Sequence, residues 1–348
     1  MPARFEITVP TDFILARDVC SYGYFLLAPS RWDPVTASYL TTLDTGERAV
    51  SLWITQGPPV APGSARDLAR RRGVPLIVRT DANIGRQEQR VIAAQIARIL
   101  RLDEDHTHLR TFHKVDPRWK ASGRGRIMRS ATLFEDVIKT VTSCNVTWPS
   151  TIIMNRRLCE IAGRKSASGH FAFPTAARLA RLRPQTLRAR CSVGYRDARI
   201  IEIARMFSRD AGPAVPPRAA APGHTWPVRT GFAAWLEEPA TGDDAVHAAL
   251  LELPGIGPYA AANIMQLLGR YARLPLDTES IRHAKSVLGF TGPDRALMKK
   301  LHAHYQPFGE HRFRSYWFEL WAFYEAQRGP AWTWERDTTG KTFTATKL

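Results

Sequence analysis

Residues 250–289, LLELPGIGPYAAANIMQLLGRYARLPLDTESIRHAKSVLG, hold the most informative pattern in the chain. They predict a helix that ends at about Leu251, a tight turn, and a second helix that begins at Pro258, because proline suits the first helical position. Gly255 and Gly257 permit a turn whose backbone amides point outward, and amides at a helix N-terminus attract phosphate. Such a turn is a clamp for DNA of any sequence. PGxG turns also join helices that bind nothing, so the hairpin alone leaves both interpretations open.

An aspartate follows this hairpin. The strand-like segment LPLDTES places Asp277, twenty positions past Gly257, at the N-cap of a helix over 278–288. A capping aspartate is usually structural. Hairpin and aspartate together, in a basic chain, favour a functional site. Leu253 and Ile256 are expected to anchor the hairpin in the core.

Composition places the chain among basic globular proteins. It has 348 residues, of which 44% are hydrophobic and 23% charged, and a formal net charge of +17. A surface this basic attracts polyanions, nucleic acid first, although an arginine-rich GC-biased genome would raise the charge without any functional demand. The sequence shows neither an apolar run of membrane-helix length nor a secretory signal, so we expect a cytoplasmic protein, nucleoid-associated if bacterial.

The cysteines predict no metal or redox cofactor. Cys20, Cys144, Cys159 and Cys191 are scattered without a CxxC pair or zinc spacing. No cysteine follows Cys191, which excludes a four-cysteine iron–sulfur loop near the C-terminus. We expect reduced thiols in a core.

The chain predicts an α+β protein. Residues 1–118 alternate the β-type runs FEITV, YGYFLLA, AVSLWIT and VPLIVRT with turns, which indicates an antiparallel sheet domain closed by a helix over 87–102. Residues 119–330 predict an all-helical body. Its helical segments are expected near 131–143, 150–162, 174–180, 196–208 and 243–251. An Ala/Pro-rich loop is expected at 208–228 and a tail at 331–348.

The hairpin and aspartate resemble the signature of the helix-hairpin-helix (HhH-GPD) DNA glycosylases, at Leu253 to Gly257 and Leu274 to Asp277. The resemblance implies that Asp277 is the catalytic carboxylate, facing the sugar of an extruded nucleotide. It also implies that the hairpin binds the DNA backbone, with a monovalent cation held by the backbone of Leu253 and Gly255. The hairpin residues are Leu253, Pro254, Gly255, Ile256 and Gly257.

Further motifs resemble the 8-oxoguanine glycosylase and 3-methyladenine DNA glycosylase II branch. An SSN-type helix start is matched by Ser143, Cys144 and Asn145, and a GYRA-like turn by residues 194–197. Weaker matches are Arg157-Leu158-Cys159, Phe173-Pro174 and the helix after Pro307. In these relatives, the positions of Asn145 and Tyr195 fill the gap left by the flipped base and wedge the opposite strand. The alternatives are a helix cap for Asn145 and a half-buried core aromatic for Tyr195.

The chain departs from that branch at two places. Bifunctional relatives place a nucleophilic lysine where this chain has Tyr259, so we expect hydrolysis by water without lyase activity. Base-reading positions fall on Phe313 and Trp317, whose aromatic rings favour an electron-poor alkylated purine. Core packing is the alternative for these aromatics. Asn263 and His283 are weaker candidates for the pocket.

The sequence therefore predicts a monomeric, monofunctional base-excision DNA glycosylase whose partner is double-stranded DNA with a damaged base. An oxidised- or deaminated-purine glycosylase is the alternative substrate class. A DNA-binding protein that lost its chemistry is the alternative of another kind, whereas a transcription factor fits poorly. The arginines considered for phosphate contact are Arg156, Arg157, Arg196, Arg282 and Arg314.

Overall fold

The computed structural model describes residues 2–57, 72–208, 231–336 and 338–339. Backbone contacts divide the chain into two compact units, each assembled from several segments. Unit 1 comprises 1–132, 147–174 and 317–348, and unit 2 comprises 133–146 and 175–316. The domain boundary at residue 118 stays a prediction.

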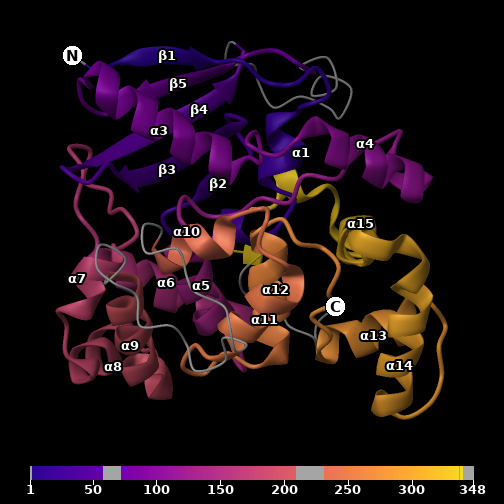
Figure 1. Cartoon of the computed structure of the whole chain (residues 1–348). Coiled ribbons are helices and arrows are strands. Elements are labelled where there is room, and N and C mark those ends of the chain that lie inside the picture. The colour runs from indigo at the N-terminus through magenta and orange to yellow at the C-terminus, as the bar shows by residue number, and fades with distance from the viewer. Residues whose placement is uncertain (1, 58–71, 209–230, 337, 340–348) are drawn as a thin grey trace. The chain divides into compact units, whose positions relative to one another are not determined.

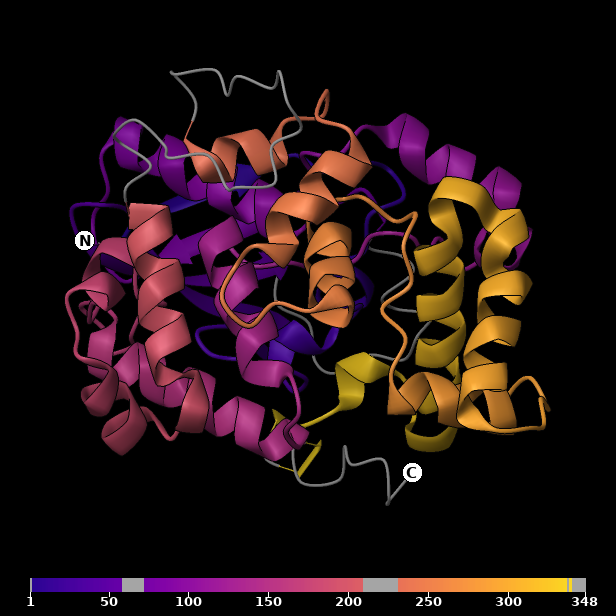
Figure 2. The same cartoon turned by 60° about the horizontal axis from the view of Figure 1, so that its bottom comes forward.

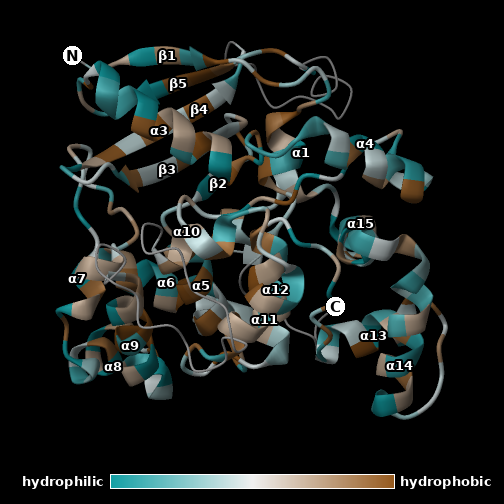
Figure 3. Ribbon diagram, viewed as in Figure 1, coloured by the Kyte–Doolittle hydropathy of each residue, from teal (hydrophilic) through white to brown (hydrophobic). Residues whose placement is uncertain are grey.

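Unit 1 is built on a five-stranded antiparallel sheet in the order β1-β5-β4-β3-β2 (Figure 1). Hydrophobic residues run through β4 and β5 (Figure 3), and Leu52, Ile54 and Val78 are completely buried. The N-terminal antiparallel sheet expected from the sequence is confirmed. The strands are β1 (Arg4–Ile7), β2 (Arg31–Asp33), β3 (Ser38–Asp44), β4 (Ala49–Gln56) and β5 (Leu76–Thr80).

One run expected to form a strand of this sheet does not, and strands β2 and β3 were not expected. The run over 22–28 forms the 3-10 helix η1 (Gly23–Leu26) instead of a strand, because an unbroken apolar run does not distinguish a strand from a buried helical turn. β3 was missed because it carries polar residues inward. Thr42 is buried and shares a 2.9 Å hydrogen bond with Ser51 of β4, which satisfies both hydroxyls across the strand pair.

Helix α3 (Arg86–Ile99) confirms the closing helix expected over 87–102 and crosses a face of the sheet (Figure 1). Its residues Ile92, Ile96 and Ile99 recur at helical spacing on one buried face. The remaining helices of unit 1 are α1 (Leu15–Val19), α4 (His106–Val115), η2 (Pro117–Trp119), α6 (Trp148–Ala162) and η5 (Ala331–Thr333).

Among its described residues, unit 2 consists of helices, as expected for the body of the chain. α7, α8 and α9 form one cluster, α5 and α11 pack on α12, and α13 packs on α14 (Figures 1 and 2). The Ala/Pro-rich loop at 208–228 lies almost wholly outside the described residues. The helices are α5 (Leu133–Ser143), α7 (Ala176–Ala180), α8 (Pro184–Cys191), η3 (Gly194–Arg196), α9 (Asp197–Ser208), α10 (Phe232–Glu237), α11 (Asp243–Leu251), α12 (Pro258–Leu267), α13 (Thr278–Ser286), α14 (Asp294–Tyr305), η4 (Gln306–His311) and α15 (Arg312–Arg328), which runs on into unit 1. Within the described ranges, no helix is both long and apolar enough to cross a membrane.

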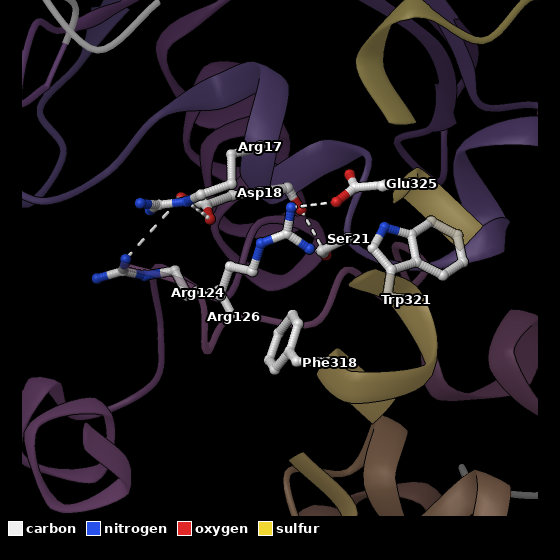
Figure 4. A pocket seen from close by; sticks show the side chains of 8 residues that line it. All are labelled: Arg17, Asp18, Ser21, Arg124, Arg126, Phe318, Trp321 and Glu325. Atoms are coloured by element: carbon white, nitrogen blue, oxygen red, sulfur yellow. Dashed lines mark hydrogen bonds and ion pairs between the residues drawn. The ribbon is translucent and has the colours of Figure 1, made fainter. Parts of the chain in front are cut away.

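A buried ion network lines a pocket of unit 1 (Figure 4). Arg17 Nε lies 2.8 Å from Asp18 Oδ1, Arg126 pairs with Asp12 at 2.7 Å, and Arg124 pairs with Glu325. Because each of these guanidinium groups already pairs with a carboxylate, we assign a structural role to the charged residues that line this pocket. Its lining residues are Arg17, Asp18, Ser21, Arg124, Arg126, Phe318, Trp321 and Glu325.

Removing the central carboxylate of this network should destabilise the protein. Asp18 is 2% exposed and accepts from both Arg17 and the Ile14 amide, so Asp18→Ala leaves a buried cation without its partner. We expect a loss of roughly 3–5 kcal/mol in the free energy of unfolding, measured by urea denaturation. The matched control is Glu6→Ala, which breaks an exposed pair with Arg4 and should cost under about 1 kcal/mol. Equal losses for the two variants would contradict the role given to Asp18.

Candidate active site

Asp277 is the N-cap of helix α13, as the sequence predicted. Its backbone is extended, with φ −143° and ψ −162°, and its Oδ1 accepts from the Ser280 amide at 3.1 Å. Ser280 Oγ in turn accepts from the Asp277 amide at 3.0 Å, which completes a capping box. The strand expected before it was wrong: residues 274–276 belong to no strand or helix of the described structure.

The Asp277 carboxyl is partly buried, and burial raises its pKa above the ordinary aspartate value. Hydrogen bonds from the Ser280 amide, Tyr259 and the Ser280 hydroxyl act in the opposite direction, and the charge of Glu279 adds to the rise. The group is therefore a carboxylate kept in a poorly solvated place by nearby donors. This is the environment in which a negative charge acts strongly on a neighbouring positive one.

Tyr259, at the lysine position of bifunctional relatives, lies on α12 and hydrogen-bonds the Asp277 side chain. The structure therefore brings together the helix after the hairpin and the aspartate, two features that are eighteen positions apart in sequence. A phenol at this place supplies a neutral donor and no amine.

The hairpin before α12 has the expected form. The Ile256 amide donates to the Leu253 carbonyl at 3.0 Å, and Gly255 at the third position has φ +78°, as in a type II turn with proline second. Leu253 and Ile256 are buried, at 2% and 6% exposed, which confirms that they anchor the turn. Gly255 and Gly257 are exposed, and the amide end of α12 follows them.

The two gap-filling candidates lie on neighbouring surface segments of unit 2. Tyr195 is 53% exposed, which excludes a core role for its ring, and Asn145 is exposed with φ +53°. The helix start expected at Ser143 was wrong, because α5 ends there and Asn145 follows the helix in a left-handed turn. Their roles at DNA stay predictions.

Arg196 ties these segments together. It donates Nε to the Val141 carbonyl at 3.1 Å and also bonds the Cys144 carbonyl, so it caps the C-terminus of α5. Burial raises the pKa of the Cys144 thiol, Arg196 lowers it and the charge of Asp277 raises it, so this loop lies within electrostatic reach of Asp277.

Two of the arginines expected to touch phosphate are buried. Arg196 is 5% exposed and Arg314 is completely buried, with its guanidinium 4.0 Å from the Tyr271 ring centre. Both expectations were wrong, because these donors serve the interior. Arg282 pairs with Glu279 at 2.6 Å and Arg156 lies 3.8 Å from Glu160, whereas Arg157 is half-buried.

Sequence reasoning missed Arg199, an exposed residue of α9. Its guanidinium lies 5.2 Å from the Tyr195 ring centre, and its side chain lies against the hairpin: a Cβ on Gly255 would come within 2.6 Å of the Arg199 Cδ. No acidic partner of Arg199 is found in the described part of the chain. Among many arginines, sequence alone gave no signal for this contact.

The three pocket candidates of unit 2 are buried. Phe313 is 1% exposed and stacks on Tyr271, with ring centres 6.4 Å apart. His283 is 1% exposed and shares a 3.0 Å hydrogen bond with Tyr305. Asn263 is buried on α12 and donates to the Tyr259 carbonyl at 3.4 Å.

Trp317 belongs to unit 1, where it is partly exposed. It donates Nε1 to the Ser21 carbonyl at 2.8 Å and stacks on Trp321, with ring centres 5.2 Å apart. A part in base recognition stays a prediction for Trp317, as it does for Phe313, His283 and Asn263. No group of three metal-binding side chains occurs within the described residues.

Comparison with known proteins gives the fold a precedent. No family model and no curated protein matches the chain. Among solved structures, 3-methyladenine DNA-glycosylase from Archaeoglobus fulgidus aligns over 93% of this chain and 98% of its own, with 17% identity and a TM-score of 0.63. The 8-oxoguanine glycosylase/lyase of Clostridium acetobutylicum, in its apo form, aligns over 86% of this chain and 93% of its own, with 15% identity and a TM-score of 0.55. Its complex with double-stranded DNA containing cytosine opposite 8-oxoG aligns over 89% and 93%, with 16% identity and a TM-score of 0.56. The chain therefore has the fold of these proteins.

Two substitutions distinguish the contribution of the Asp277 charge from the contribution of its capping oxygen. Asp277→Asn keeps an oxygen that accepts from the Ser280 amide, so α13 stays capped and the free energy of unfolding should not fall by more than about 0.5 kcal/mol. Asp277→Ala removes the cap and should cost about 1 kcal/mol. Thermal and urea unfolding of the two variants measure the difference. Equal stability of the alanine variant and the wild type would show that the cap contributes little.

If the exposed hairpin binds a DNA phosphate, Arg199, whose side chain lies against Gly255, is expected to contact that phosphate as well. Arg199→Ala should weaken binding to all duplexes similarly and reduce the slope of log K against log salt by about 1, because about one counterion fewer is released. Fluorescence anisotropy with undamaged DNA at several salt concentrations measures the slope. The control is Arg4→Ala, an exposed arginine of β1 beside Glu6 that was not considered for phosphate contact. If Arg199→Ala leaves the slope unchanged, Arg199 is only a surface charge.

Proposed function

We propose that this chain, which has the fold of helix-hairpin-helix DNA glycosylases, is a monofunctional base-excision DNA glycosylase acting on an alkylated purine. The observation that carries the proposal is the placement of Asp277. It caps α13, is partly buried, and is hydrogen-bonded by Tyr259 from the helix that follows the phosphate-type hairpin. An aspartate that only capped a helix would need neither the partial burial nor the hydrogen bond from Tyr259 of α12.

The chemistry proposed for Asp277 follows from its charge. As the bond between the sugar C1′ and the base nitrogen breaks, the electron pair leaves with the base and positive charge builds on the sugar. An ionised carboxylate nearby stabilises that charge, and it orients the attacking water and accepts its proton as oxygen bonds to C1′. The products are the free base and an intact abasic site.

Tyr259 supports hydrolysis by water alone. A lyase step needs a neutral amine to attack the sugar and form a Schiff base, and a phenol hydrogen-bonded to Asp277 supplies none. The Clostridium acetobutylicum protein of the same fold is described as a glycosylase/lyase, so the fold by itself permits either outcome.

Several exposed features of unit 2 support double-stranded DNA as the partner. The exposed hairpin glycines and the amide end of α12 suit a phosphate, and the carbonyl oxygens of Leu253 and Gly255 suit a monovalent cation. Exposed Tyr195 and Asn145 suit insertion into the duplex. Flipping a base costs a few kcal/mol of stacking, which such inserted side chains partly offset.

The substrate class rests on aromatic chemistry. A partly exposed indole such as that of Trp317 gains more from a cationic base than from a neutral one, and an alkylated purine is such a base. The Archaeoglobus fulgidus neighbour is named for 3-methyladenine. An oxidised purine is the second candidate, because another neighbour is named for 8-oxoguanine.

Base release decides between these proposals. Duplexes with N3- and N7-alkylpurines, hypoxanthine, uracil or 8-oxoguanine are incubated with wild type and Asp277→Asn, and borohydride trapping tests for a Schiff base. We expect release of an alkylated purine, an intact abasic site, no trapped adduct, and a rate for Asp277→Asn lower by roughly a hundredfold or more. Trapping would contradict the monofunctional proposal. Tight binding without any release would favour a DNA-binding protein that lost its chemistry.

A further inference from the structure

A chain of hydrogen bonds runs from Asp277 into the interior of unit 2. Ser280 Oγ lies 3.2 Å from Asp277 Oδ1 and 2.7 Å from the hydroxyl of Tyr316, which belongs to the first turns of α15. Ser280 is completely buried and Tyr316 is 3% exposed. A helix cap alone would need only the first of these contacts.

The number of protons sets the direction of the chain. Ser280 Oγ carries one proton and two lone pairs, and it already accepts from the Asp277 amide at 3.0 Å. If it donates to Tyr316, the carboxylate loses a charge-assisted hydrogen bond, the stronger kind. The arrangement that satisfies every group has Tyr316 donating to Ser280 and Ser280 donating to Asp277 Oδ1.

Tyr316 suits the role of permanent donor. Burial and the nearby charge of Asp277 raise the pKa of its hydroxyl, so it keeps its proton throughout the working range of the protein. Its ring is held by Tyr305, at 5.5 Å between ring centres, and by the edge-on His283, at 5.6 Å. The hydroxyl is therefore fixed in place by packing.

We infer that Tyr316, acting through Ser280, is a positioning residue that fixes Oδ1 of Asp277 and holds the carboxylate ionised for glycosidic bond cleavage. The inference rests on the proposed function. The carboxylate is held on two sides, by Ser280 of α13 with Tyr316 behind it and by Tyr259 of α12. Neutral donors thereby offset the cost of burying a negative charge.

The other charged or titratable groups that act on the carboxylate and its chain are few within the described residues. Glu279, next to it on α13, raises the pKa of Asp277, and Cys144 lies within its electrostatic reach beyond α5. Arg282 lowers the pKa of Tyr316 and pairs with Glu279. None of these groups replaces the donor that Tyr316 supplies to Ser280.

Tyr316→Phe tests the inference because it removes one hydroxyl and keeps the ring. Losing the Tyr316 hydroxyl favours the protonated form of Asp277, so the pKa of this carboxyl rises. Because activity needs the ionised carboxylate, the activity of the variant should begin to fall at a higher pH than that of the wild type. We expect the acid limb of the single-turnover rate to move up by about 0.5 pH unit, a rate lower by roughly three- to tenfold, and unchanged DNA affinity. Ser280→Ala should shift the limb further, and adding Tyr316→Phe to it should have almost no extra effect.

Tyr305→Phe is the matched control. Tyr305 is also a completely buried tyrosine beside Tyr316, but its hydroxyl bonds His283 and not the chain that leads to Asp277. Its variant should lose similar stability and keep the acid limb of the wild type. Equal shifts in the two variants, or none in Tyr316→Phe, would overturn the inference.

A second readout separates this inference from the proposed function. The pKa of Asp277 is followed by carbon-13 NMR of its labelled carboxyl group, assigned with Asp277→Asn. Tyr316→Phe should raise this pKa and Tyr305→Phe should not, whether or not the protein releases a base. If the wild type releases no base, the proposed function fails. If the pKa is the same in wild type and Tyr316→Phe, the positioning role fails.

Discussion

The capping box of α13 is the interaction on which the candidate site depends. Asp277 satisfies an amide that would otherwise be unpaired at the start of the helix, and the Ser280 hydroxyl satisfies the Asp277 amide in return. This exchange fixes the carboxylate relative to the helix axis without a ligand. A group that must act on a transient charge gains from such preorganisation, because no free energy is then spent on ordering it during the reaction.

Burial and hydrogen bonding oppose each other at this carboxylate, and the balance sets its use. Partial exclusion of water raises its pKa but strengthens its field, whereas the donors Ser280 and Tyr259 lower its pKa without adding a positive charge. In the proposed reaction, a lysine at position 259 would add a charge that competes with the sugar for the carboxylate. The neutral phenol of Tyr259 would leave the sugar cation as the strongest partner of Asp277.

Local patterns predicted the parts of this site that are local. The turn at Leu253–Ile256 and the cap at Asp277 follow from residue types over a few positions, so the sequence was sufficient for both. The contact of Tyr316 with Ser280 joins residues 36 positions apart, and that of Arg199 with Gly255 joins helix α9 to the distant hairpin turn. Periodicity gives no register for such pairs. For the same reason β3 was not predicted. Its Thr42 is polar, and only the hydrogen bond to Ser51 of the neighbouring strand explains why this residue is buried.

Arginine content illustrates why charge alone gives a weak residue-level prediction. Arg196 and Arg314 serve carbonyls and an aromatic ring in the interior, while Arg199 is exposed between Tyr195 and the hairpin. The difference is one of side-chain direction: Arg196 ends η3 and is buried, whereas Arg199 lies on the exposed side of α9. In the proposed DNA complex Arg196 would act indirectly, because it fixes the end of α5 and so holds Asn145 near the segment that carries Tyr195. The surface proposed to meet DNA is therefore shaped by buried cations as well as charged by exposed ones.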